Sequence, residues 1–113
     1  MAKYDMDVYE ALADPTRREI VALLAGGETS AGDIAGRFPI AGPSVSRHLK
    51  VLRESGLITY RREGVSRLYR LQPEPLDQAR QWMQAQLDLV GERFDRLGAH
   101  LDRMKAQDEP EGG

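Results

Sequence analysis

The stretch Pro39–Leu71 constrains the fold most, because it reads as one helix followed by a hairpin. Gly42 and Pro43 predict the start of the helix, since a proline in the first turn gives up an N–H that has no partner there anyway. Gly56 predicts its end. One apolar stripe with the 3.6-residue helical period lies between these signals and consists of Val45, Leu49 and Leu52. The sequence therefore predicts a helix with one buried side.

The opposite side of this helix carries hydroxyl and cationic groups, a surface that a DNA major groove accepts. The candidate DNA contacts on it are Ser44, Ser46, Arg47, His48 and Lys50. Arg47 can pair with guanine through two hydrogen bonds, whereas Lys50, one turn further on, is expected to meet phosphate. Ser44 has a second interpretation as a helix cap. His48 has one as a structural residue that holds the helix to the hairpin.

Two short runs with strand composition follow the helix, Leu57–Tyr60 and Arg67–Leu71, and the segment Arg61–Ser66 joins them around a central glycine. We predict a β-hairpin with a basic tip. The arginines that flank the tip, and that we expect to contact phosphate or the minor groove, are Arg61, Arg62 and Arg67. Arg67 could instead pair with an acidic neighbour. A helix followed by such a hairpin is a recognition helix and its wing.

Charge is distributed unevenly along the chain. Residues 43–72 carry seven Lys and Arg against two Glu, a local charge of +5, although the whole chain carries -2. An asymmetry of this size within one small domain indicates a surface that faces a polyanion, with an acidic remainder.

The residues before this stretch predict three short helices. Val8–Ala13 forms the first, and Asp14 with Pro15 starts the second as N-cap and first helical residue. Ser30 begins a capping box that opens the third helix, and its position at a helix N-terminus also suits a phosphate. The third helix and the recognition helix together form a helix-turn-helix.

The last segment, residues 75–107, carries a seven-residue repeat typical of a coiled-coil seam. Two series of apolar residues, offset by four, make up the seam: Leu76, Met83, Val90, Leu97 and Met104, with Leu87, Phe94 and Leu101. A helix of roughly 30 residues is about 45 Å long, more than so small a domain can cover. We therefore expect a second chain to cover part of it; the alternative is a helix that packs only on its own domain.

These elements predict a mainly α fold with a small β-hairpin. Residues 1–74 are expected to form a winged helix-turn-helix, residues 75–107 a dimerisation helix within the same compact domain, and residues 108–113 a disordered tail. A chain of 113 residues offers little room for a deep catalytic cleft, and its two histidines lie on different elements. We expect no enzyme activity and no cofactor. The apolar runs are too short to span a membrane and no signal peptide is evident, so we expect a cytoplasmic protein.

The phrases SRHLKVLRESGLI and RREGVSRLYRL, together with ALADPTRREIVALL, resemble the ArsR-type winged-helix repressors over roughly residues 9–71. The resemblance implies a homodimer clamped by the first and last helices, two recognition helices in successive major grooves of double-stranded DNA, and repression of transcription. The implied dimer contacts are Leu12, Met83, Leu87, Val90, Phe94, Leu97 and Leu101. The competing function is a protein-interaction adaptor that uses a winged helix without specific DNA binding.

The sequence departs from this family at its metal sites. The cysteine site of the third helix would fall near Ser30–Ile34, and the chain contains no cysteine. On the last helix His100 stands with only Asp88 and Asp102 as companions, and the family's pairs of Asp, His and Glu are absent. We therefore predict no metal site, and the resemblance does not specify which effector, if any, releases the DNA.

Overall fold

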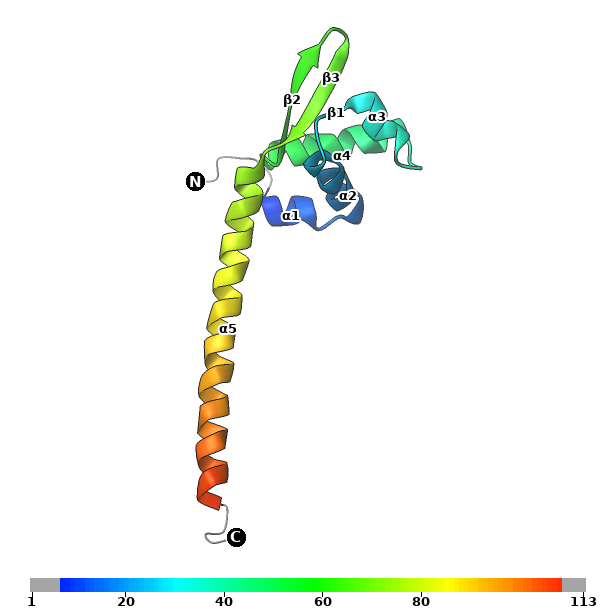
Figure 1. The fold of residues 1–113 in the computed structure, drawn as a ribbon. Helices are drawn as coiled ribbons and strands as arrows, with labels where there is room; N and C mark the ends of the chain where they lie inside the picture. Colours follow the sequence, from blue (N-terminus) through cyan, green and yellow to red (C-terminus); the bar gives the residue numbers. More distant parts are fainter. Residues whose placement is uncertain (1–6, 109–113) are drawn as a thin grey trace. The chain divides into compact units, whose positions relative to one another are not determined.

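The computed structural model of the chain describes residues 7–108 (Figure 1). Its elements in chain order are α1 Val8–Leu12, α2 Pro15–Ala25, β1 Thr29–Ser30, α3 Ala31–Gly36, α4 Gly42–Glu54, β2 Ile58–Glu63, β3 Ser66–Leu71 and α5 Pro73–Asp108. This is the predicted mainly helical winged helix-turn-helix with a long last helix. Asp108, expected in the tail, is the last residue of α5, and residues 109–113 lie outside the described part.

The chain divides into two compact units, Met1–Ala79 and Arg80–Gly113. The start of α5 belongs to the first unit, where Ala79 is buried and Leu76 packs against the core. None of the helices in residues 7–108 is long and apolar enough to cross a membrane.

The core of the first unit is built where the helical periods predict it. Its fully buried large side chains are Ile20 of α2, Ile34 of α3, Leu52 of α4 and Leu57, which lies between α4 and β2. The caps also follow the sequence. Asp14 accepts hydrogen bonds from the N–H groups of Thr16 and Arg17 at the start of α2.

The sheet has three strands in the order β1-β3-β2, so the prediction of a two-stranded hairpin was incomplete. The missed strand, β1, is only two residues long and pairs antiparallel with β3 through Thr29 opposite Tyr69 and Ser30 opposite Leu68. A segment this short has no alternation of its own to read. Its pairing ties the start of α3 to the hairpin.

The hairpin turn is shorter than predicted, because β2 and β3 run up to a two-residue loop, Gly64 and Val65. Gly64 has φ 61° and Val65 does not have a positive φ, which suits a type II′ turn with glycine in its first position. The predicted loop Arg61–Ser66 was therefore too long, although Arg62 and Arg67 still face each other one pair before the tip, as residues that flank it. Arg61 and Arg62 lie within β2, opposite Leu68 and Arg67.

Candidate nucleic-acid interface

Helix α4 has the two sides that its sequence predicts. Val45, Leu49 and Leu52 are each no more than 5% exposed and pack into the core. The polar residues divide by exposure: Ser46, Arg47 and Lys50 are exposed, and Ser44 and His48 are half-buried. Ala41 is the N-cap and no side chain caps this end, so the capping role considered for Ser44 is not found. The exposed hydroxyl and cationic groups thus lie on a helix whose opposite side is packed into the core.

His48 is linked to α2. Its ring nitrogen Nδ1 lies 3.3 Å from Nη1 of Arg17, which belongs to α2. The sequence analysis considered that His48 could hold the recognition helix to the hairpin. The structure places its partner, Arg17, on α2 instead. The imidazole therefore connects the helix expected to read DNA with the scaffold.

In strand β2, Arg61 is engaged by two carboxylates. Its Nε and Nη2 donate to the two carboxylate oxygens of Glu28 at 3.1 and 2.8 Å, and its Nη1 lies 3.0 Å from Glu63. The hydrogen bonds from Arg61 lower the pKa of Glu28, and the same pairing raises the pKa of Arg61. Contact between Arg61 and phosphate would have to compete with both carboxylates.

Arg67 lies over an aromatic ring, and no ion pair with an acidic neighbour is found for it in the described residues. Its guanidinium carbon is 4.8 Å from the ring centroid of Tyr60, and that of Arg53 at the end of α4 is 5.2 Å from the same centroid. Tyr60 in turn packs on Tyr69. The sequence analysis did not identify Tyr60 as a residue that positions the arginines of this surface. Arg62 is exposed and, within residues 7–108, forms no ion pair with an acidic side chain.

Ser30 lies at the N-terminus of α3, where its Oγ accepts a hydrogen bond from the N–H of Asp33 at 3.1 Å. This confirms the capping interaction that the sequence indicated. The hydroxyl still has a proton to donate, so its predicted contact with phosphate is compatible with the cap.

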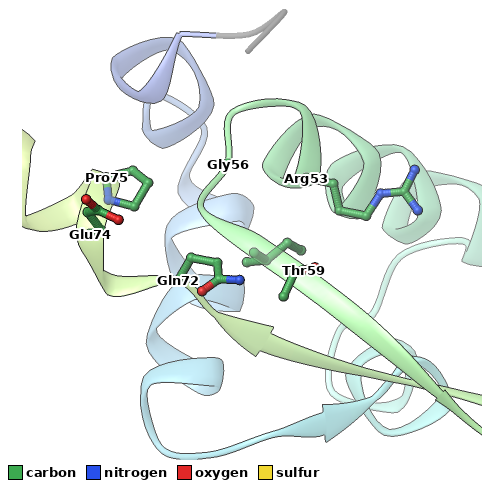
Figure 2. Close-up of a pocket in the computed structure, with 7 residues that line it drawn as sticks. Arg53, Gly56, Thr59, Gln72, Glu74 and Pro75 are labelled. Atoms are coloured by element: carbon green, nitrogen blue, oxygen red, sulfur yellow. The ribbon is translucent and has the colours of Figure 1, made fainter. Parts of the chain in front are cut away.

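A cavity of about 340 Å³ lies where α4 ends, β2 begins and α5 starts (Figure 2). Arg53, Gly56, Ile58, Thr59, Gln72, Glu74 and Pro75 line it. Figure 2 shows the Arg53 guanidinium directed away from Glu74 and Pro75, and this group lies over Tyr60 instead. The lining therefore does not bring its two charged groups together as an acid-base pair would require.

Comparison with known proteins identifies the family. A family described as a helix-turn-helix domain matches residues 12–61. The transcriptional repressor SdpR of Bacillus subtilis is 43% identical over 77 residues, which are 68% of this chain and 86% of that protein. A crystal structure of an ArsR family transcriptional regulator superposes with a TM-score of 0.68 at 32% identity, over 74% of this chain and 86% of the other.

This chain belongs to the ArsR family.

A third match extends further along the chain. The crystal structure of a possible transcriptional regulator for arsenical resistance covers 93% of this chain and 99% of its own at 38% identity, with a TM-score of 0.64. The family confirms the predicted class, a DNA-binding transcriptional repressor with a winged helix-turn-helix. Which residues of this ArsR-family chain touch DNA stays a prediction.

The second unit of this ArsR-family chain presents the predicted seam on α5. Every large apolar residue of the seam from Met83 onward is exposed in the single chain, with Phe94 at 67% and Leu87 at 64%. The others are Met83, Val90, Leu97, Leu101 and Met104. Leu12, the predicted dimer contact on α1, is half-buried and packs against the core of the first unit. Residues of this kind seldom stay exposed together on one side of a helix in a monomer.

Proposed function

We propose that this ArsR-family chain acts as a homodimer that binds two half-sites in duplex DNA and represses transcription by occupying a promoter. The observation that carries the proposal is α4, whose apolar residues are buried while Ser46, Arg47 and Lys50 stay exposed on the opposite side. A helix held in this way can present its N-terminal side chains to base edges.

The proposed contacts divide into two classes. Arg47 and Ser46 lie in the first turns of α4 and read bases, whereas Lys50 and the exposed Arg62 of β2 neutralise phosphates. Ser44, His48 and Ser30 contact the backbone at the edges of this surface. Arg61 and Arg67 also contact DNA but contribute less to the affinity, because their guanidinium groups already have partners within the chain.

The seam of α5 supports the dimer. Apolar side chains repeated every three or four residues and exposed in a single chain are the pattern of a helix that pairs with another. We assign the seam residues from Met83 to Leu101 to the interface, and we assign Leu12 of α1 to it as well. Two linked recognition helices gain affinity because the second binding event becomes intramolecular.

The proposed binding to DNA also determines what we propose for location and for catalysis. Because the proposed partner is chromosomal DNA, we place the protein in the cytoplasm and propose that it works by binding and not by catalysis. We assign no inducing ligand.

The test compares two arginines. Arg47→Ala should relax discrimination at one base position by about 1–3 kcal/mol, whereas Arg62→Ala should weaken binding to all duplexes alike and reduce the salt dependence. Arg103→Ala, an exposed arginine of the second unit, is the matched control and should change neither. Equal effects of Arg47→Ala and Arg62→Ala on operator and random DNA would show that these roles are wrong.

A parent protein that binds random duplex DNA without salt dependence would instead favour the adaptor, since binding to phosphates releases counterions and is strongly weakened by salt.

A further inference from the structure

Arg17 joins three parts of the first unit. Its Nε donates to the carbonyl oxygen of Ala11 at 2.6 Å and its Nη2 to that of Glu10 at 3.1 Å, so two donors fix the guanidinium against the end of α1. Its Nη1 lies 3.3 Å from Nδ1 of His48 on α4. A guanidinium fixed by two hydrogen bonds has little freedom in where it directs its next N–H group.

This contact fixes which nitrogen of the imidazole carries the proton. A guanidinium has only donors, so Nδ1 of His48 must accept the hydrogen bond and cannot itself hold a proton. In the neutral ring the proton then resides on Nε2. The nitrogen that faces away from Arg17 is therefore a hydrogen-bond donor.

The donor at Nε2 reaches solvent. Within the described residues no buried side-chain nitrogen or oxygen lacks a partner, and Nε2 of this half-buried ring has no partner in the chain. It must therefore be accessible. The charged groups that interact with the ring are Arg17 and the N-cap Asp14 on α2, whereas Arg47 and Lys50 of its own helix are exposed at other angles around α4.

We infer that Arg17 is a positioning residue for DNA binding, which acts through His48 by holding the imidazole so that Nε2–H donates to a phosphate oxygen of the operator. The inference rests on the proposed function. It adds that Nε2 of His48 is the contacting atom, that this nitrogen carries the proton, and that Arg17 supports the contact without touching DNA. Phosphate contacts of this kind set the register of a recognition helix on the duplex.

Two substitutions at His48 separate this role from a merely structural one. In His48→Gln the side-chain amide can place a donor near the position of Nε2 but no acceptor near Nδ1. In His48→Asn the amide can place an acceptor near Nδ1 but no donor near Nε2. We expect His48→Gln to keep operator affinity within about threefold of the parent and His48→Asn to lose about tenfold or more, since hydrogen bonds to charged groups are the strong ones.

The opposite order, with His48→Asn near the parent and His48→Gln reduced, would mean that His48 only ties α4 to α2 and would overturn the inference. Equal affinities of the two variants would overturn it as well. A neutral imidazole displaces no counterion, so His48→Asn should leave the slope of log affinity against log salt unchanged. Lys50→Ala should make this negative slope less steep by about 0.9, because one phosphate contact is lost. A similar drop in the slope for His48→Asn would contradict the neutral donor.

A spectroscopic measurement tests the protonation state directly. Long-range ¹H–¹⁵N spectra of the free protein at pH 7.5 should show Nε2 protonated and Nδ1 unprotonated, and a protonated Nδ1 would overturn the inference. Arg17→Met should weaken operator binding in the parent but add little in the His48→Asn background. Additive losses would show that Arg17 acts by another route. A parent that fails to bind any duplex would overturn the proposed function and this inference together, whereas a parent that binds while the two His48 variants behave alike overturns the inference alone.

Discussion

Leu101→Glu tests whether the seam of α5 holds the dimer. Leu101 is 53% exposed in the single chain, so about half of its surface is available to a partner. Full burial of a leucine stabilises by about 1.5–3 kcal/mol, which gives about 0.8–1.6 kcal/mol for the exposed half and roughly twice that for the two copies in a dimer. A carboxylate placed in the same contact adds a desolvation cost. Since about 1.4 kcal/mol corresponds to a factor of ten, the dimer dissociation constant should rise at least tenfold.

Sedimentation velocity over a range of protein concentrations measures this directly, and circular dichroism reports whether the helices persist. We expect Leu101→Glu to shift towards monomer, to keep its helical signal, and to lose operator binding at concentrations that saturate the parent. Ala99→Glu introduces the same charge two residues away, on the other side of α5, and should remain a dimer. If Leu101→Glu sediments and binds as the parent does, this part of the seam is not the interface.

Three further predictions follow from single positions. Asp14→Ala should lower the free energy of unfolding by about 1 kcal/mol in denaturant titrations, because Asp14 caps α2. Partial burial acts to raise the pKa of Asp14, but the backbone N–H groups of Arg17 and Thr16 and the charge of Arg17 outweigh it and lower this pKa. The stabilisation is therefore complete above about pH 4–5, falls away as the pH drops through the lowered pKa, and should not show this acid dependence in Asp14→Asn. Gly91→Ala should raise the free energy of unfolding by up to about 1 kcal/mol, because an added Cβ meets nothing within 4 Å in the single chain; a weaker dimer would reveal a closely packed partner helix. Micromolar zinc should leave operator affinity unchanged, because the described residues contain no cluster of three metal-binding side chains; a tenfold loss that His100→Ala abolishes would contradict this.

The parts of the fold that the sequence predicted are those that local chemistry determines. The buried stripe of α4 follows from helical periodicity, and the start of α2 follows from Asp14 and Pro15, whose capping and fixed φ act within one turn. Residues such as Leu52 could therefore be assigned to the core without knowing what they pack against.

The missed features depend on residues distant in the chain. Strand β1 exists because Thr29 pairs with Tyr69, 40 residues later, and Ser30 pairs with Leu68, 38 residues later. Nothing in these two residues alone requires a strand. Glu28 and Arg61 are 33 residues apart, so their ion pair could not be anticipated from either segment. The hairpin loop was misjudged for a different reason, since arginines in a polar run look like loop residues until cross-strand pairing places them in β2.

The candidate site shows how these distant contacts change the interpretation of a basic segment. Counted along the sequence, Arg61, Arg62 and Arg67 contribute three equal charges to the wing. In the structure Arg61 is held by Glu28 and Glu63, and Arg67 lies over Tyr60. Exposed ion pairs contribute little to stability, so a phosphate can still compete for Arg61, but it must first displace the two carboxylates. The positive charge of the wing that no carboxylate pairs with, within the described residues, therefore comes from Arg62, Arg67 and Arg70, and of these Arg67 is restrained by its contact with Tyr60.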